Sequence, residues 1–312
     1  MRRIVYRESA ANNEGIASAD DNLLLSPCCP KETCRLELQV TRSPRHIDDD
    51  LMTSYIERTL PFARRAEARE HLDTCGECWV NWNTFRWRRA RGSRGYLELK
   101  EYLGDDFQEG LDSSWALADE WRERNPKTKE EIERFYAETP YYVYNLLIWK
   151  ESGQRPPYVH YALPHLRRSG AHRICDYGCG IGNDGLELLE RGYEVVFCDF
   201  DNPSTRFLRW RIERRGLTAT FIPPNEAENL KSFETLWAVD VIEHLPDPYG
   251  SLAPFLRGAR TFVTGTEHDT KSHGRQPFHI QHPEARLVEF YRSIGFIESS
   301  KARELIIWQR TG

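Results

Sequence analysis

The stretch ICDYGCGIGNDG, residues 174–185, begins with a short apolar run and continues with four glycines. This pattern is typical of a buried strand that turns tightly into a helix, where the bare backbone can approach a ligand. Two motifs overlap in it: G-x-G-x-x-G at 180–185, which is typical of a dinucleotide site, and D-x-G-x-G-x-G at 176–182. The stretch therefore predicts a cofactor-binding turn, and residues beyond it must identify the cofactor.

The chain around this turn alternates between apolar runs and amphipathic segments, which predicts an α/β fold with a doubly wound parallel sheet. The predicted strands lie at 172–177, 193–201, 217–224, within 233–245, at 259–266 and, as two final strands, within 296–309. The predicted helices lie at 184–192, 204–216, 248–258 and 282–295.

The first half of the chain has a different pattern, which predicts helices at 49–60, 61–72, 78–90 and repeatedly within 97–150. Pro61 suits the first turn of the second helix, and Ser113 or Ser114 can cap the helix that ends before Asn125. We expect four regions. They are a poorly structured arm at 1–44, a helical module at 45–95, a helical linker that covers the substrate at 96–160, and the α/β domain at 161–312.

The acidic residues near the glycines favour one cofactor over the other. Asp176 ends the first strand, where it would repel a pyrophosphate but attract the positively charged amino group of a methionine moiety. Asp199 ends the second strand and can accept hydrogen bonds from both hydroxyls of a ribose, which fits either cofactor. Residues 176–182 are thus the better match, and Gly185 becomes incidental.

The stretch AVDVIEHLPDP at 238–248 completes this pattern. With the glycine motif, it resembles class I S-adenosylmethionine (SAM)-dependent methyltransferases, most nearly the small-molecule enzymes of the ubiquinone and menaquinone biosynthesis type. The resemblance covers about residues 160–312 and implies a Rossmann-like methyltransferase sheet that binds SAM. The SAM-binding residues that it implies are Asp176, Gly178, Gly180, Gly182, Asp199, Phe200, Asp240 and Val241, with Asn225 and Glu226 near the adenine.

Candidate bases follow the fourth and fifth predicted strands. Methyl transfer from a sulfonium depends mainly on positioning, and a base is needed only if the acceptor must lose a proton. Five of the ten histidines fall between residues 244 and 282. We assign Glu243, His268 and His279 as catalytic candidates. The alternatives are a cluster that holds a metal, as in some phenol O-methyltransferases, or histidines that serve only in loops and caps. The other candidates considered are His244, Glu267, His273 and His282.

A second motif, H-x3-C-x2-C, is formed by His71, Cys75 and Cys78. Two thiolates and an imidazole at this spacing can supply three of the four ligands of a tetrahedral zinc ion. Residues 45–90 resemble the zinc-binding domain of anti-sigma factors, and this resemblance implies His46 as the fourth ligand. Cys28, Cys29 or Cys34 could supply it instead. The zinc could brace the fold, form part of a docking module for a protein partner, or act as a redox sensor.

Composition limits the partners. The chain has 43 Lys and Arg against 48 Asp and Glu, a net charge of −5, which disfavours a nucleic-acid binder. The run FRWRRARGSR at 85–94 could contact single-stranded nucleic acid, but it also suits a solvated helix end. No apolar run is long enough to span a membrane, and no secretory signal is present. We therefore expect a cytoplasmic protein with reduced cysteines.

Together these features predict a SAM-dependent methyltransferase with a structural or docking zinc module. Its acceptor is expected to be a small molecule, methylated on oxygen or nitrogen. Six aromatic residues before the α/β domain could form a wall of the acceptor pocket or could simply pack helices on the sheet. They are Tyr141, Tyr142, Tyr144, Trp149, Tyr158 and Tyr161. The alternatives are an RNA or protein methyltransferase, and a zinc-containing regulatory protein that binds SAM without catalysis.

Overall fold

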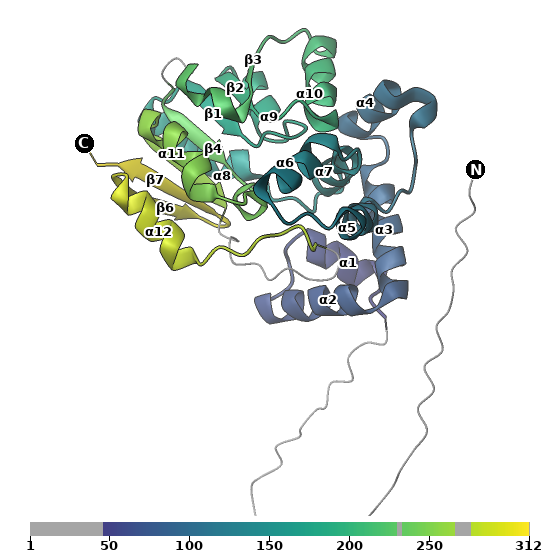
Figure 1. Cartoon of the computed structure of the whole chain (residues 1–312). Coiled ribbons are helices and arrows are strands. Elements are labelled where there is room, and N and C mark those ends of the chain that lie inside the picture. Colours follow the sequence, from purple (N-terminus) through teal and green to yellow (C-terminus); the bar gives the residue numbers. More distant parts are fainter. Residues whose placement is uncertain (1–45, 230–232, 266–275, 312) are drawn as a thin grey trace, which may run out of the picture. The chain divides into compact units, whose positions relative to one another are not determined.

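A seven-stranded sheet forms the centre of the chain's second half (Figure 1). The computed structural model describes residues 46–229, 233–265 and 276–311. The strand order is β3-β2-β1-β4-β5-β7-β6, in which β1 to β5 are parallel and β7 runs antiparallel to both β5 and β6. The strands are β1 (Arg173–Tyr177), β2 (Glu194–Cys198), β3 (Thr220–Ile222), β4 (Thr235–Ala238), β5 (Thr261–Gly265), β6 (Phe296–Ala302) and β7 (Leu305–Arg310).

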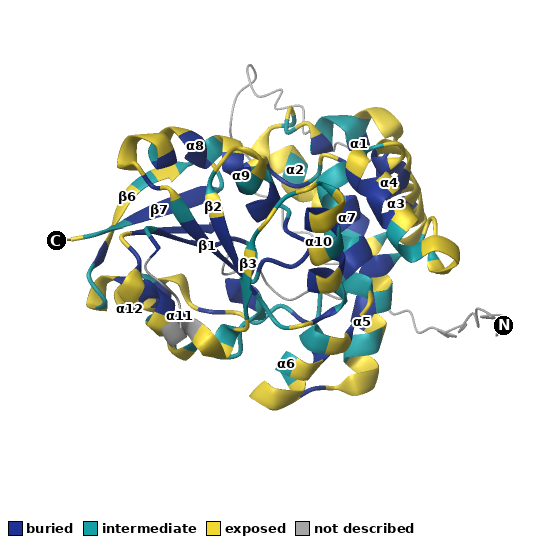
Figure 2. Cartoon of the chain, turned by 90° about the horizontal axis from the view of Figure 1, so that it is seen from above, coloured by how far each residue is buried: buried dark blue, intermediate teal, exposed yellow. Residues whose placement is uncertain are grey.

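Helices cover both faces of this sheet. Three of them, α8 (Tyr158–Ser169), α9 (Gly185–Glu190) and α10 (Pro203–Arg214), pack in one apolar cluster with the strands. The other two, α11 (Pro248–Gly258) and α12 (Glu284–Ser293), pack in a second cluster on the opposite side. Figure 2 shows the strands buried between these two layers. The predicted doubly wound α/β sheet is therefore confirmed.

Among the described residues, seven α-helices precede α8. The first three, α1 (Asp49–Ile56), α2 (Phe62–Thr74) and α3 (Gly76–Ala90), share a core of their own around Met52 and Trp82. The next four are α4 (Arg94–Leu103), α5 (Ser113–Arg124), α6 (Lys129–Glu138) and α7 (Tyr141–Glu151). A further cluster joins α3, α4 and α7 to Ile181 of the glycine turn and to Phe207 of α10. This cluster attaches the helical half to the sheet.

Two details of the predicted helices are wrong. The cap of α5 is Asp112, whose Oδ1 accepts a hydrogen bond of 3.2 Å from the backbone N–H of Trp115, and not Ser113 or Ser114. A carboxylate three residues before an N–H is well placed for this bond, while Ser114 is used by Asn145. Pro61 lies just before the first turn of α2, not in it.

The predicted regions at 45–95, 96–160 and 161–312 stay a prediction, because residues 44–312 form one compact unit. The predicted arm at 1–44 lies outside the described residues. Within the described part of the chain, no helix has both the length and the apolar composition of a membrane span.

Candidate functional site

The glycine turn follows β1 and depends on the absence of side chains. Gly178, Gly180 and Gly182 have φ values of +68°, +51° and +75°, which L side chains rarely adopt. A Cβ at Gly178 would overlap with Val241, and a Cβ at Gly180 would lie 2.7 Å from Leu146. The turn therefore requires glycine at these positions.

Asp176 is buried at the end of β1 and supports the turn from behind. Its Oδ2 accepts a hydrogen bond of 3.1 Å from the N–H of Gly185, the first residue of α9. Burial and then the nearby Asp184 raise the pKa of Asp176 well above its usual range. A Cβ at Gly185 would overlap with the Asp176 carboxyl and with the ring of Phe197. Gly185 is thus required by packing, and its interpretation as incidental is wrong.

Asp199 connects the end of β2 to the same turn. Its Oδ2 accepts from the N–H of Gly180 at 2.8 Å, and its Oδ1 accepts from the N–H of Phe200 at 2.7 Å. Burial raises the pKa of Asp199 to about 6. The carboxylate is therefore held by the backbone at the edge where the parallel strands end.

A cavity of about 660 Å³ opens at this edge. Six of the eight predicted SAM-binding residues line it, and so does Asn225, while Asp176 and Gly182 are not on its wall. The six are Gly178, Gly180, Asp199, Phe200, Asp240 and Val241. A volume of this size is within the range of cofactor sites.

A buried charge network lies beneath the turn. Arg155 donates to Asp184 at 2.5 and 2.6 Å and to Asp240 at 3.1 Å. Asp240 also accepts from the Tyr158 hydroxyl at 3.2 Å and has a φ of +58°, which is unusual for a residue other than glycine. Asp240 is thus fixed in a strained conformation on the cavity wall.

A second cavity, of about 250 Å³, adjoins the first, and Tyr142, Leu146, Asp240 and His244 line both. Its other walls come from α1 to α3, from α7 and from the loops after β4 and β5. Of the predicted aromatic wall, Tyr142, Trp149 and Tyr158 line this cavity, whereas Tyr144 packs among α3, α4 and α7. The aromatic stretch therefore contributes both to a cavity wall and to the packing of helices.

Two of the three catalytic candidates, Glu243 and His279, line the smaller cavity. The ring of His279 lies 4.8 Å from the ring of His244, measured between centroids. Burial lowers the pKa of His244 to about 4, and its Nδ1 lies 3.1 Å from the Tyr136 hydroxyl, so its imidazole is neutral near pH 7.

The remaining candidates are elsewhere. The third catalytic candidate, His268, lies outside the described residues, as do Glu267 and His273. His282 contacts the carbonyl oxygen of Leu245 through Nε2 at 2.9 Å, which is a loop-supporting contact.

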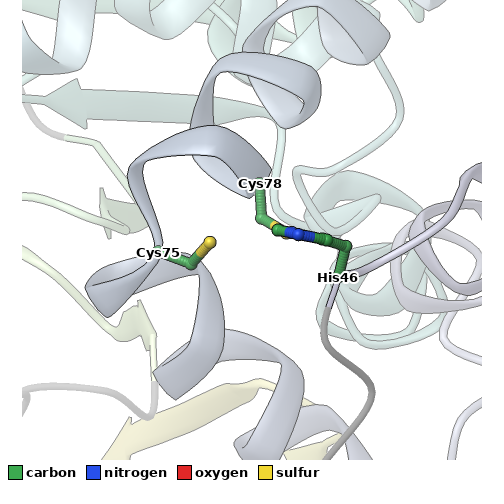
Figure 3. A group of neighbouring side chains, drawn as sticks. All are labelled: His46, Cys75 and Cys78. Carbon is green, nitrogen blue, oxygen red and sulfur yellow. The ribbon is translucent and has the colours of Figure 1, made fainter.

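Three of the four residues assigned as zinc ligands, His46, Cys75 and Cys78, form one group before α1 and at the α2–α3 junction, and His71 contacts Cys78 of this group. Cys78 Sγ lies 3.2 Å from His71 Nε2 and 3.5 Å from His46 Nδ1. Ligand atoms of His46, Cys75 and Cys78 all lie within 4.8 Å of one another. Figure 3 shows these three side chains together. Two thiols and two imidazoles are a donor set that zinc prefers. Cys28, Cys29 and Cys34 lie outside the described residues.

The arginines at 86–94 are engaged within the protein. Arg88 pairs with Asp49 at 2.6 Å, Arg91 pairs with Glu109 at 2.5 Å, and Arg94 pairs with Glu190 at 2.9 Å. These contacts support the interpretation of the run as a helix end.

Sequence reasoning missed two contributors to the site, Arg155 and Tyr136. Arg155 lies in the turn GQRPPY, which has no motif of its own, and it meets Asp240 85 residues later. Tyr136 meets His244 108 residues later. Local spacing carries no signal for contacts at such separations.

Comparison with known proteins supports the two resemblances. Residues 49–78 match the model of the family described as "Putative zinc-finger". Glycine N-methyltransferase of Mus musculus is 32% identical over 73 residues, which are 23% of this chain. The match spans only about a quarter, 24%, of that curated protein.

The chain is also similar to several solved structures. Magnesium protoporphyrin IX methyltransferase from Synechocystis PCC 6803, solved with bound SAM, is 16% identical, with a TM-score of 0.42 over 71% of this chain and 99% of its own. TehB from Haemophilus influenzae is 17% identical, with a TM-score of 0.39 over 48% of this chain and 61% of its own. The resemblance to SAM-dependent methyltransferases and to a zinc-binding family is confirmed, with the zinc-binding match lying at the N-terminal helices.

Proposed function

We propose that this protein transfers a methyl group from SAM to an oxygen or nitrogen of a small-molecule acceptor. The observation that carries this proposal is the pair of adjoining cavities that share Asp240 and His244. The larger cavity, with the glycine turn and Asp199, suits a nucleoside cofactor with a methionine end. The smaller cavity suits the acceptor, because a molecule bound there would lie next to the methyl donor.

SAM supplies an activated methyl group when it is bound, so the main task of the protein is positioning. Asp199 would accept hydrogen bonds from the ribose hydroxyls, and the turn of Gly178 and Gly180 would lie against the cofactor. Asp240, held by Arg155, would contribute to the wall between donor and acceptor. Asp176 supports the turn from behind the cavity. A direct contact between Asp176 and the methionine end of SAM stays a prediction.

A base, where the acceptor requires one, would be Glu243 or His279, since both line the smaller cavity. Neutral His244 is a weaker candidate, because burial lowers its pKa to about 4 and leaves it little affinity for a proton. His268 stays a candidate from the sequence alone.

Zinc would be held by His46, Cys75 and Cys78 with His71 as the fourth ligand. A closed site with four protein ligands is structural. Leu72 and Trp79, each next to a ligand, line the smaller cavity. This arrangement favours a zinc module that braces the acceptor pocket over one that serves only to dock a protein.

The size of the smaller cavity favours a small molecule over RNA or protein as the acceptor. Isothermal titration calorimetry with SAM tests the first step of the proposal, and transfer of a radiolabelled methyl group from SAM to a small-molecule library tests the second. Absence of SAM binding would contradict the proposal. Binding without transfer to any acceptor would favour the regulatory alternative.

A further inference from the structure

We propose that Nε2 of His244 accepts a hydrogen bond from the nucleophilic O–H or N–H group of the methyl acceptor, and that Tyr136 fixes the tautomer that makes this possible. This inference rests on the proposed function and assigns a binding role to a residue that lines both cavities. It follows from the hydrogen bonds around the imidazole of His244, because these determine which ring nitrogen carries the proton.

The hydroxyl of Tyr136 meets two groups. It donates to the backbone carbonyl oxygen of Phe278 at 2.9 Å, and it lies 3.1 Å from Nδ1 of His244. A phenol has one proton to donate and a carbonyl oxygen can only accept, so this proton lies in the bond to Phe278. Nδ1 must then be the donor in its contact with the Tyr136 oxygen. The ring proton of His244 is therefore on Nδ1.

The protonation state of the ring determines what the other nitrogen can do. Burial lowers the pKa of His244 to about 4, and the opposing effect of the Phe278 carbonyl is smaller, so the imidazole is neutral near pH 7. A neutral imidazole has a proton on one nitrogen and a lone pair on the other. Nε2 of His244 is therefore a hydrogen-bond acceptor and cannot donate.

Nε2 is the nitrogen that a bound molecule can use. Within the described ranges, no residue forms a hydrogen bond with Nε2, whereas Nδ1 is engaged by Tyr136. His244 lines the smaller cavity and the larger one. An acceptor in the smaller cavity that reached His244 would thus have its reacting group beside the proposed SAM site.

Three aromatic rings hold the imidazole in place. The rings of Tyr136 and Tyr142 meet it edge to face, with centroids 5.4 and 6.0 Å away, and the ring of Phe278 stacks on it at 6.0 Å. These contacts restrict rotation of the imidazole, so the direction of Nε2 is set before an acceptor binds. A preorganised partner of this kind lowers the entropic cost of binding.

This hydrogen bond would align the nucleophile for transfer. The nucleophile's lone pair forms the bond to the methyl carbon, and the carbon–sulfur bond breaks with its electron pair left on sulfur. The proton of the acceptor passes to Glu243, His279 or water, since His244 has little affinity for it. His244 would bind the acceptor, and Tyr136 is a positioning residue that acts through His244.

The same geometry limits the substrate class. A hydroxyl group or a neutral primary or secondary amine has both a hydrogen for Nε2 and a lone pair for the methyl group. A tertiary amine or an ionised carboxylate has no such hydrogen, and its lone pairs would face the lone pair of Nε2. We therefore expect acceptors of the first kind.

The tautomer is tested by nuclear magnetic resonance on the full chain, loaded with zinc and carrying 15N-labelled histidine, at pH 7.5. The variant His244→Gln identifies the resonances of His244. We expect a proton on Nδ1 and none on Nε2 in the wild type, and a shift of the population toward the Nε2–H tautomer in Tyr136→Phe. Tyr102→Phe is the matched control, because Tyr102 packs with Phe207 and Trp210 and lines neither cavity.

A proton on Nε2 in the wild type would overturn the inference, and it would do so even if SAM binds and methyl transfer occurs. An unchanged tautomer in Tyr136→Phe would overturn the role of Tyr136. Absence of SAM binding by the wild type would instead contradict the proposed function, and the tautomer measurement does not depend on it.

The hydrogen bond to Nε2 is tested with paired probes that differ in one donor. The pairs are phenol with anisole and aniline with N,N-dimethylaniline, each added to the same labelled chain saturated with S-adenosylhomocysteine. At least one donor should shift the Nε2 resonance, and its methylated partner should not. Equal shifts within both pairs, or no shift in either, would overturn the inference.

Transfer kinetics test the role in the reaction, with the best acceptor from the radiolabel screen. His244→Leu should lower kcat/KM about ten-fold or more and leave SAM affinity unchanged, because the donor of the acceptor loses its partner. His244→Gln should recover part of this loss, since its amide oxygen can accept a hydrogen bond. Equal kcat/KM in His244→Leu and the wild type would overturn the inference.

Discussion

The guanidinium of Arg155 lies 3.1 Å from the carboxylate of Asp240 and so joins the turn before α8 to a residue that lines both cavities. The same guanidinium pairs with Asp184 at 2.5 Å, and both of these side chains are only 4% exposed. Burial lowers the pKa of Arg155, but Asp184 and Asp240 outweigh this effect and raise it. Arg155 is therefore charged at any pH at which the protein is folded.

Replacing Arg155 should destabilise the protein strongly. Arg155→Met would leave Asp184 buried without its cationic partner, with the indole N–H of Trp237 still donating to it at 3.0 Å. Removal of one member of a buried ion pair costs about 3–5 kcal/mol. Urea unfolding measures this change. Arg168→Met, at an exposed position on the neighbouring α8, should stay within about 0.5 kcal/mol of wild type. A loss below about 1 kcal/mol in Arg155→Met would contradict the structural role of this network.

SAM affinity should depend on pH through Asp199. The pKa of Asp199 is raised to about 6, so its carboxylate becomes protonated as the pH falls below 6 and would no longer accept hydrogen bonds from both ribose hydroxyls of the proposed cofactor. Affinity should therefore be constant near pH 8 and fall between pH 7 and 5. Folding stability should respond in the opposite sense. The pKa of Asp199 is higher in the folded protein than in the unfolded chain, so its ionised carboxylate lowers the free energy of unfolding above pH 6. This loss of stability disappears as the pH falls and Asp199 becomes protonated in the folded protein.

Asp199→Asn is the control for this titration. Calorimetry should show SAM binding weakened about 10- to 100-fold, since hydrogen bonds to a charged group contribute about 1.5–3 kcal/mol. The remaining affinity should no longer change between pH 7 and 5. The same pH dependence in the variant as in the wild type would assign the titration to another group.

Zinc should bind once per chain and stabilise the helical module. His71→Ala and Cys75→Ser should each lower the metal content, measured by atomic emission, and lower the melting temperature, because metal binding contributes to folding free energy. His172→Ala, an exposed histidine before β1, should keep its zinc. Full zinc occupancy in both ligand variants would rule out this site.

Glu98 should anchor the helical half to the glycine turn. It pairs with Arg211 at 2.8 Å and with Arg215 at 2.7 Å, and Arg211 also donates to the carbonyl oxygen of Ile181 at 2.8 Å. Glu98→Ala should cost about 3–5 kcal/mol in urea unfolding. Glu101→Ala removes an exposed pair with Arg214 and should cost no more than about 1 kcal/mol. Equal losses of unfolding free energy in Glu98→Ala and Glu101→Ala would contradict the anchoring role of Glu98.

The stabilisation by Glu98 should also depend on pH. Burial raises the pKa of Glu98, but Arg215 and Arg211 outweigh this effect and hold it below its ordinary value of 4.5. The contribution is therefore complete above pH 4.5 and is lost as the pH falls through the lowered pKa. Wild type should lose more stability than Glu98→Ala over this acid range.

The substitution Gly185→Ala should reduce both stability and SAM affinity, since the added Cβ has no room between Asp176 and Phe197. The expected cost is about 1–3 kcal/mol, as for other overpacked sites. At Gly258, the last residue of α11, an added Cβ would lie 3.5 Å from Phe233, which is ordinary contact. Gly258→Ala should therefore be close to wild type in thermal unfolding and in calorimetry.

By itself, the sequence determined the parts of this protein that are encoded over short spacings. The alternation of apolar runs and helices predicted the sheet, because a parallel strand pair requires a crossover helix. Two motifs were recognisable in the sequence: the glycines at 178, 180 and 182, and the H-x3-C-x2-C spacing. They could be recognised because the residues of each motif lie within a few positions of one another. The antiparallel position of β7 between β5 and β6 had no such local signal.

Only the tertiary structure decided what these parts do for one another. Arg155 reaches Asp240, Tyr136 reaches His244, and Glu304 reaches Arg58 across 85, 108 and 246 positions of the chain. The cap of α5 and the need for Gly185 depend on neighbours that packing brings close. The smaller cavity is likewise made from α1 to α3 and from residues at the carboxyl ends of β4 and β5. Its charge distribution exists only once packing has placed their side chains around one space, since sequence spacing carries no information on distances between elements so far apart.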